Sequence, residues 1–253
     1  MLMTRVMPCL LLRGLGLVKT IKFKNPTYIG DPINAVMIYN TKEVDELIFL
    51  DITATKENKK PNTELIRKIA NECFMPFAYG GGIRDLKTVK KIFNLGTEKI
   101  VVNTKALESP NFIGKVSKIY GSQSIIVSID VKKNLFGKYE VFSHARGKST
   151  GLDPVDFAVK MEKIGAGEIF LNSVDRDGTM EGYDIELIKK VSEAVSIPVI
   201  ACGGAGKVED FGKAVKIGGA SAVAAGSMFV FHGRRRAVLI NFPTREELEK
   251  VLG

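Results

Sequence analysis

Short apolar runs rich in β-branched residues recur along the chain, and a segment with helical periodicity follows each of them. The runs are typical of buried strands and begin near Arg5, Glu46, Met75, Glu98, Ser124, Glu168, Pro198 and Ser221. The helical segments cover about 32–43, 61–73, 85–95, 109–119, 153–164, 182–194, 207–217 and 244–252. Pro61 and Pro154 suit first helical turns, and Asp153 suits the N-cap before the second of them. Strands that alternate with helices without a linker predict a single (βα)8 TIM barrel over residues 1–253, with a doubly wound open sheet as the alternative.

The intervals between the strand starts repeat. The first four strands begin 41, 29 and 23 positions apart, and the last four begin 44, 30 and 23 positions apart. Local motifs repeat in step with them. Gly80-Gly81-Gly82-Ile83 and Gly203-Gly204-Ala205-Gly206 stand 123 positions apart, as do Asn103-Thr104 and Gly226-Ser227. The repeat predicts a barrel made of two fused half-barrels, about 1–120 and 121–253.

Composition and charge narrow the class of protein. The 253 residues are 45% hydrophobic and 26% charged, which is typical of a globular chain. The net charge is +9, but the lysines are dispersed, and the one dense basic cluster, Arg234-Arg235-Arg236, has no nucleic-acid-binding motif beside it. No apolar run approaches the roughly 18 residues that span a bilayer, and the apolar start of the chain reads as a first strand rather than a leader. We therefore expect a cytoplasmic protein that binds neither nucleic acid nor a membrane.

Three cysteines and two histidines limit the metal and redox chemistry. Cys9, Cys73 and Cys202 stand far apart in the sequence without metal-ligand spacing, which favours a reducing compartment over a disulfide scaffold. His144 and His232 are the only histidines, so a multi-histidine metal site is excluded. The sequence predicts no metal and no cofactor.

The repeated glycine and hydroxyl motifs predict an anion site at the mouth of the barrel, because the loops that follow the strands build the site in this fold. Glycines let backbone N–H groups approach an oxyanion, and Thr, Ser and Asn side chains add donors. The candidate residues are Gly82, Asn103 and Thr104 in the first half and Gly203, Gly204, Gly226 and Ser227 in the second. Two equivalent sites predict a small-molecule ligand with a phosphate at each end. The alternative is that the glycines only serve tight turns.

Carboxylates at strand ends are the candidate acid–base groups. Asp51, Asp130, Asp175 and Asp177 stand there, and a carboxylate beside bound anions can act as a general acid or base near neutral pH. The repeat predicts an aspartate opposite Asp130 at the end of the first strand, but that position is Leu11. Leucine cannot transfer a proton, so a symmetric acid–base pair is broken.

Four charged residues stand at the opposite ends of the strands. Arg5, Glu46, Lys99 and Glu168 lie at or near the starts of the first, second, fourth and sixth strands. The pattern alone favours solvated strand edges. The alternative is that the four side chains point inward and close a polar ring around the barrel axis.

Six motifs run through almost the whole chain: RVMPC, DELIFLDITA, YGGGIRDL, YGSQSIIVSIDVKK, GAGEIFLNSVDRDGTMEGYD and IPVIACGGAG. Together they resemble the cyclase subunit of imidazole glycerol phosphate synthase. The resemblance implies that a class I glutaminase docks on the N-terminal face of the barrel and that ammonia then passes a charged gate to a diphosphate substrate. Its gate residues match Arg5, Glu46, Lys99 and Glu168, and its phosphate-binding residues match the seven candidates named above.

The same resemblance implies roles at the mouth. Its two catalytic aspartates fall at Asp130, which is present, and at position 11, which is Leu. Lys19, in the first βα loop, would close over the substrate. Asp51 and Asp177 are further candidates for supporting roles.

The departures from the family pattern form a group. Leu11 replaces a catalytic aspartate, Ala145-Arg146 replaces a glycine pair after His144, and the tail reads HGRRRAVLINFPTREEL. With PCLLLRG, FKNPTYIGDPINA and FGKYEVFSHARG, these features resemble a paralogous branch linked to acetamidino modification of surface sugars in lipopolysaccharide, capsule or flagella. In that branch the barrel and its glutaminase would supply ammonia to a separate sugar amidotransferase.

Three functions remain open on the sequence. The first is this ammonia-relay subunit of a glutamine amidotransferase pair. The alternative is the cyclase itself, a lyase of histidine biosynthesis that forms imidazole glycerol phosphate and an aminoimidazole carboxamide ribotide from a phosphoribosyl substrate and ammonia. The third is a phosphosugar isomerase on the same phosphate loops, which would need no charged ring and would normally need both aspartates.

Overall fold

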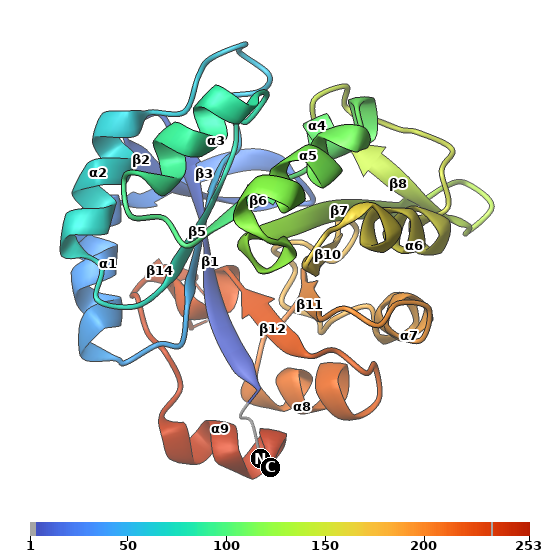
Figure 1. Ribbon diagram of the computed structural model, residues 1–253. Coiled ribbons are helices and arrows are strands. Elements are labelled where there is room, and N and C mark those ends of the chain that lie inside the picture. The colour runs from blue at the N-terminus through green and yellow to red at the C-terminus, as the bar shows by residue number, and fades with distance from the viewer. Residues whose placement is uncertain (1–3, 234) are drawn as a thin grey trace.

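The computed structural model describes residues 4–233 and 235–253, so residues 1–3 and Arg234 of the basic cluster lie outside the described residues. Eight parallel strands pair in a closed circle (Figure 1). In order around the circle they are β1 (Arg5–Arg13), β4 (Leu47–Asp51), β5 (Phe77–Gly80), β6 (Lys99–Val102), β7 (Ile125–Lys133), β10 (Glu168–Ser173), β11 (Val199–Cys202) and β12 (Ala222–Ala225). The closed circle confirms the predicted (βα)8 barrel and excludes the open sheet.

The first strand is shared between its two neighbours. Residues 5–8 of β1 pair with residues 222–225 of β12, and residues 9–12 pair with residues 48–51 of β4. The barrel therefore closes through one strand that joins the beginning of the chain to its end.

The predicted helices surround the barrel (Figure 1). They are α1 (Pro32–Thr41), α2 (Thr63–Glu72), α3 (Leu86–Phe93), α5 (Asn111–Tyr120), α6 (Pro154–Ile164), α7 (Ile185–Ser192), α8 (Val208–Lys216) and α9 (Arg245–Leu252). Many begin behind an acidic or amide side chain that accepts a backbone N–H of the first turn, as Asp153 does from Val155. The prediction that Pro61 lies in the first turn of α2 is wrong. Asn62 takes the N-cap position, where its side chain accepts a hydrogen bond from the Leu65 N–H, so Pro61 precedes the helix.

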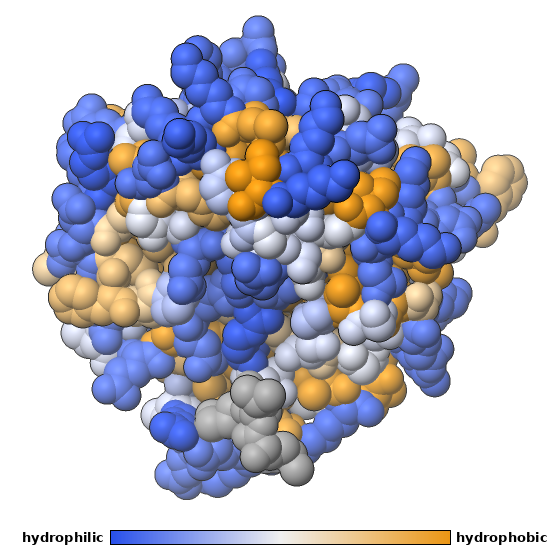
Figure 2. Space-filling view, viewed as in Figure 1, coloured by the Kyte–Doolittle hydropathy of each residue, from blue (hydrophilic) through white to orange (hydrophobic). Residues whose placement is uncertain are grey.

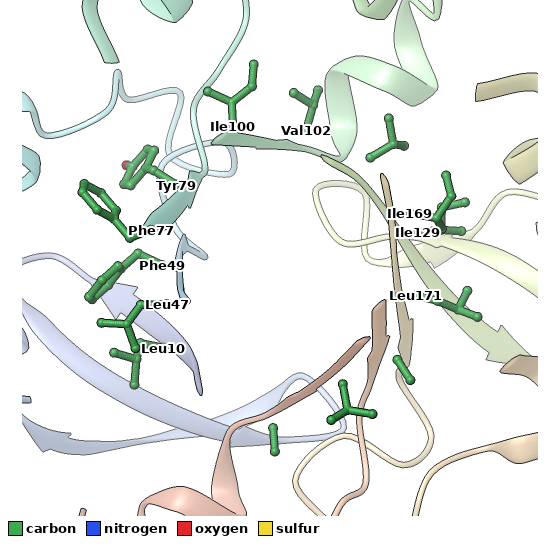
Figure 3. Close-up of a cluster of buried hydrophobic side chains, with 14 of the residues drawn as sticks. Leu10, Leu47, Phe49, Phe77, Tyr79, Ile100, Val102, Ile129, Ile169 and Leu171 are labelled. Atoms are coloured by element: carbon green, nitrogen blue, oxygen red, sulfur yellow. The ribbon is translucent and has the colours of Figure 1, made fainter. Parts of the chain in front are cut away.

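Side chains alternate between the two faces of each barrel strand. The outward set packs between the strands and the helices, where Leu10, Phe49, Tyr79, Val102 and Ile169 are drawn in Figure 3. The inward set forms a second cluster inside the barrel, made of Met7, Cys9, Ile48, Ala78, Val101, Ile126, Phe170, Ile200, Cys202, Ala222 and Ala224. Because both faces are buried, the strands read as nearly continuous apolar runs.

Within the described residues, three pairs of short antiparallel strands outside the barrel and several short turns were not predicted. The hairpin strands are β2 (Gly16–Ile21) with β3 (Lys24–Gly30), β8 (Tyr139–Ser143) with β9 (Lys148–Ser149), and β13 (Phe231–His232) with β14 (Ala237–Val238). The short helical turns are α4 (Thr104–Glu108), η1 (Ser122–Ser124) and η2 (Ser227–Phe229). All three hairpins follow the C-terminal ends of barrel strands, and the first two occupy the longest intervals between strand starts.

Candidate functional site

A cavity of about 220 Å³ opens at the C-terminal ends of the barrel strands. Its walls contain the mouth residues that the sequence predicted: Lys19, Asp51, Gly82, Asn103, Thr104, Asp130, Asp177, Gly203, Gly204, Gly226 and Ser227. Leu11 lies in the same wall. Residues far apart in the sequence thus converge on one pocket, to which all eight barrel strands contribute.

The two halves of the mouth share one backbone conformation. Asn103 has φ −113° and ψ −82°, and Gly226, at the repeated position, has φ −116° and ψ −72°. A short helical turn follows each of them, beginning at Thr104 in α4 and at Ser227 in η2. The first N–H groups of a helical turn have no partner within the turn, so each half offers backbone donors beside a hydroxyl.

The glycines of the mouth are required for different reasons. Gly81 and Gly204 have φ of +113° and +112°, which only glycine adopts readily, so these two serve the turns as the alternative interpretation proposed. Gly226 has an ordinary negative φ, but a Cβ there would overlap the Lys19 Nζ. Gly226 therefore provides room for an amino group in the pocket rather than for a turn.

Asp130 lies within β7 and faces the pocket. Its Oδ2 accepts a hydrogen bond from Asn103 Nδ2 at 3.1 Å. Burial, followed by the nearby charge of Asp177, raises the pKa of Asp130 to about 7, although the Asn172 and Asn103 side chains oppose the rise. A carboxyl with this pKa is present in both protonation states near neutral pH, so it can donate or accept a proton.

Lys19 lies in the connection between the first barrel strand and the first helix, where it belongs to β2 and is buried. Its Nζ donates to the Cys9 carbonyl oxygen, and burial lowers its pKa. The Cys9 side chain interacts with that of Cys202, which lines the same pocket. The two cysteines stand far apart in the sequence but meet in the pocket wall, where Lys19 faces them.

The β2–β3 hairpin lies over the pocket and reaches the loop after β10. Thr20 Oγ1 donates to Asp177 Oδ2 at 2.9 Å, and the Lys22 N–H donates to the Asp177 carbonyl oxygen at 2.9 Å. The Phe23 ring meets the His144 ring edge to face, with centroids 5.3 Å apart. Burial raises the pKa of Asp177, and its hydrogen bonds with Thr20 and Phe23 oppose that rise. We name this hairpin, which lines the pocket and is held to the loop after β10, the lid.

Gly178 is enclosed between two hairpins. A Cβ at Gly178 would overlap the Thr20 carbonyl oxygen of the lid. From the other side, Arg236 Nη2 in the β13–β14 turn donates to the Gly178 carbonyl oxygen at 2.6 Å. The tail hairpin therefore supports the loop against which the lid closes.

The remaining predicted carboxylates have structural partners. Asp51 Oδ1 accepts from the Thr53 N–H, the Thr53 hydroxyl and the Ala54 N–H, each at 3.0 Å, and so holds the turn after β4. Asp175 Oδ2 accepts from the Lys133 N–H at 2.8 Å and does not line the pocket. Position 11, where the repeat predicts a partner for Asp130, presents an apolar side chain.

The charged residues at the other end of the barrel form a closed ring of ion pairs. Arg5 contacts Glu46 at 2.7 Å and Glu168 at 2.6 Å. Lys99 contacts the same two carboxylates at 3.0 and 2.9 Å. Glu46 and Glu168 are 3% and 7% exposed, so the interpretation as solvated strand edges is wrong and the inward ring is correct. Burial alone would lower the pKa of Arg5, but its two glutamate partners raise it.

Side chains alternate between the two faces of a strand, so every second residue points into the barrel, and these inward residues run from the ring to the pocket. Three strands place a ring residue, an apolar residue and a pocket residue on one inner face: Arg5, Met7 and Cys9; Lys99, Val101 and Asn103; Glu168, Phe170 and Asn172. The inside of the barrel is therefore layered, with charges at one end, apolar side chains in the middle and polar groups at the mouth.

The sequence interpretation missed several residues of the site. Asn172 lines the pocket, is 7% exposed, and has no hydrogen-bond partner for Oδ1. It stands four positions after Glu168 on an inner strand face, which is the signal that could have identified it. Phe23 and His144 were missed because their contact depends on two hairpins that the pattern did not reveal.

Metal and membrane features were sought over the described ranges. Among residues 4–233 and 235–253, no three His, Cys, Asp or Glu side chains are grouped so that they could hold a metal ion. Within the same ranges, every helix is too short or too polar to span a bilayer.

Comparison with known proteins places the chain among relatives of similar length. The model of the histidine biosynthesis protein family matches residues 5–235. A Pseudomonas aeruginosa protein provisionally named imidazole glycerol phosphate synthase subunit hisF2 is 51% identical over 249 residues, which are 98% of this chain and 99% of the relative. A Leptospira interrogans protein, also provisionally named subunit HisF of this synthase, is 49% identical over 98% of both chains. The imidazole glycerol phosphate synthase subunit HisF of Alkaliphilus metalliredigens is 40% identical over 92% of both chains.

Proposed function

The chain belongs to the histidine biosynthesis protein family, and from this premise we propose that it is a cyclase-type barrel subunit that passes ammonia from a glutaminase to a sugar-amidinating enzyme. The Pseudomonas relative carries a numbered name, hisF2, which supports a role beside that of an ordinary synthase subunit. The product of the proposed assembly is an acetamidino group on a surface sugar.

The observation that carries this proposal is Leu11 in a pocket that is otherwise intact. Leu11 lines the wall that also holds Asp130 and Asn103. A ring closure that needs two proton carriers on opposite sides of its substrate loses one of them here. The ion-pair ring at the other end is complete. A chain that keeps its entrance but lacks half of its acid–base pair is suited to conduct ammonia.

The layered interior supports the passage of a neutral molecule. A glutaminase on the N-terminal face would release ammonia beside the ring formed by Arg5, Glu46, Lys99 and Glu168. The next layer is apolar, with Met7, Ile48 and Phe170 fully buried. Transfer of ammonium into such a layer is strongly unfavourable, whereas neutral ammonia loses far less solvation. The layer therefore selects the form of the molecule that can react at the mouth.

The proposal is tested by reconstitution from three purified proteins: this chain, its class I glutaminase and the sugar amidotransferase. We expect close to one amidinated sugar for each glutamine hydrolysed, and a large excess of hydrolysis over amidination when the barrel is omitted. Leu11→Asp should leave the ratio unchanged, because the relay uses no acid–base pair. A ratio that does not depend on the barrel would refute the relay.

The second candidate is the cyclase reaction. The matched turns at Asn103-Thr104 and Gly226-Ser227 favour it, and we name these two candidate phosphate sites the cradles. Asp130, with a pKa of about 7, would be the proton carrier, and Lys19 would approach the substrate from the lid. The test is a steady-state assay of the purified chain with the phosphoribosyl substrate of imidazole glycerol phosphate synthase and an ammonium salt. We expect negligible turnover for the native chain. Turnover at an ordinary enzymatic rate, about 1–1000 per second, would identify the chain as a cyclase despite Leu11.

A further inference from the structure

The turn between β7 and β8 presents two large apolar side chains to solvent. We name residues 134–137 the β7–β8 finger; it projects at the right-hand edge of Figure 1. Leu135 and Phe136 at its tip are 101% and 95% exposed, more than any other large hydrophobic residue that the structure describes. In Figure 2 the end of this projection has the colour of hydrophobic residues beside a hydrophilic surface.

Polar contacts below the tip hold the finger in shape. Asn134 Oδ1 accepts from the N–H groups of Phe136 at 2.9 Å and Lys138 at 3.0 Å. Asn134 Nδ2 donates to Glu140 Oε1 at 2.8 Å, and the Gly137 N–H donates to the Asn134 carbonyl oxygen at 3.0 Å. The tip side chains are not needed for this geometry. Turn positions are normally occupied by polar residues or glycine, so Leu135 and Phe136 have no role in the fold that explains them.

We propose that the β7–β8 finger is the docking site for the ammonia-consuming sugar amidotransferase, an inference that rests on the proposed function. Leu135 and Phe136 enter an apolar pocket of that enzyme. A preorganised turn loses little conformational entropy on binding, and large apolar anchors at the centre of a contact supply most of the binding energy.

The charges around the tip define the chemistry of the partner. Lys132, Lys133 and Lys138 flank the finger, while the nearby carboxylates have partners of their own: Glu140 is engaged by Asn134, Glu186 by Lys190 and Asp153 by the Val155 N–H. A basic collar around an apolar tip fits an apolar pocket with carboxylates on its rim. The docking surface of the amidotransferase is therefore acidic at its edge and apolar at its centre.

The position of the finger indicates which partner it meets. The finger extends β7, the strand that carries Asp130, so it stands at the end of the barrel where the pocket opens. The ion-pair ring lies at the opposite end, and a glutaminase seated there does not reach the finger. An enzyme that receives ammonia from the mouth must bind on the finger's side.

A hollow beside the finger completes the docking surface. It has a volume of about 290 Å³ and lies between the finger and the first turns of α6 and α7. Gly137, Lys138 and Tyr139 line one side, and the other side is lined by Asp153, Pro154, Val155, Glu186, Leu187 and Lys190. The contact thus combines a projecting tip with a recess that accepts a side chain of the partner.

The test uses the reconstituted three-protein system and the double variant Leu135→Ser/Phe136→Ser. We expect the concentration of amidotransferase that gives half-maximal glutamine-dependent amidination to rise at least tenfold. The rate with saturating ammonium chloride, the binding of the glutaminase and the thermal unfolding of the barrel should not change. Met37→Ser is the matched control, because Met37 is 50% exposed in the middle of α1, away from both ends of the barrel. It should leave the half-maximal concentration of amidotransferase unaltered.

Other outcomes would overturn the inference. An unchanged half-maximal concentration in the double variant means that the finger is not the docking site. Loss of self-association in ultracentrifugation would assign the finger to a second copy of the chain, and loss of sedimentation with phosphatidylserine vesicles would assign it to a membrane. If the native proteins give no glutamine-dependent amidination, the proposed function fails first, and that result is distinct from a defect confined to the double variant.

Discussion

Burial sets the proton chemistry of individual residues at the mouth. The pKa of Asp130 is raised to about 7 and the pKa of Lys19 is lowered, each chiefly because the charged form loses its hydration. Leu11 lines the same pocket and adds apolar surface to its wall. One group with two accessible protonation states is thus left where the repeat predicts a pair.

Because the pKa of Asp130 is raised, replacing Asp130 with a neutral residue should stabilise the protein, and the stabilisation should depend on pH. Between about pH 4 and 7 this carboxyl is protonated in the folded protein but ionised in the unfolded chain, so the folded state loses stability as the pH rises through this range. Asp130→Asn is neutral throughout and should raise the free energy of unfolding by about 1–4 kcal/mol above pH 7, with little effect near pH 4. Urea unfolding between pH 4.5 and roughly pH 8.5 measures the difference. Parallel curves for the two proteins would contradict a raised pKa.

Lys99 tests the ion-pair ring at the level of one side chain. Lys99→Ala leaves Glu46 and Glu168 with Arg5 as their only ring partner. We expect a loss of about 1–3 kcal/mol of unfolding free energy, because buried carboxylates lose a cation. Glutamine hydrolysis should exceed amidination in the reconstituted system, because the proposed ammonia entrance would lose one of its four charges. Normal coupling in Lys99→Ala would show that the ring is structural and not a gate.

At the scale of elements, the lid depends on a loop that belongs to another part of the barrel. The β2–β3 hairpin is bonded to Asp177, and the next residue, Gly178, is bonded to Arg236 of the tail hairpin. Three elements from the beginning, middle and end of the chain thus meet above the pocket. A change in the loop after β10 should therefore act on the lid without touching β2 or β3.

Gly178→Ala is the direct test of this arrangement. The new Cβ would overlap the Thr20 carbonyl oxygen, and φ at this position is +71°. We expect the lid to open, so that trypsin cuts after Lys22 and Lys24 at least several times faster than in the native protein. Gly147→Ala is the control, because φ is +65° there but nothing lies near its Cβ. Equal cleavage rates in both variants would mean that backbone strain, not the contact with Thr20, opens the lid.

Hydrophobic periodicity predicts the barrel elements well because their strands are buried on both faces. Strand starts such as Met75 and Glu98 lie within two residues of the observed Phe77 and Lys99. The same double burial hides which face points inward, so the sequence alone could not show that Arg5 and Glu46 face the axis. The lid hairpin was missed because Lys22 and Phe23 adopt left-handed φ values of +53° and +62°, and neither residue type signals such a turn.

The candidate pocket residues were predictable to a similar degree. Those that repeat, such as Thr104 and Ser227, stand at strand ends and line one cavity. Asn172 and His144 do not repeat, and their place in the wall depends on strand register and on the β8 hairpin. The proximity of Cys9 and Cys202 likewise depends on the closure of the barrel. Closure brings β1 near β11, although these strands are far apart in the sequence.

The whole molecule has two matched cradles across one mouth, and this predicts how it responds to phosphates. A ligand that binds only the folded state raises its stability by about 2.7 kcal/mol at one hundred times its dissociation constant. Thr104→Val and Ser227→Ala should each remove about half of the stabilisation by inorganic phosphate. Either variant should remove most of the stabilisation by a linear bisphosphate that reaches both cradles. Thermal unfolding with each ligand measures the stabilisation. If the substitutions reduce the stabilisation by the bisphosphate no more than that by inorganic phosphate, the two cradles act separately.

The sharing of β1 between its two neighbours has a consequence during synthesis on the ribosome. Residues 5–8 have no strand partner until residues 222–225 are synthesised, and at about 5–20 residues per second this takes roughly 10–40 s. An unpaired apolar edge is a template on which other nascent chains can add a strand. Pro8 lies within this edge and has no N–H to offer, and Arg5 at its end brings a charge. The segment that must wait longest for its partner therefore carries its own protection against co-translational aggregation.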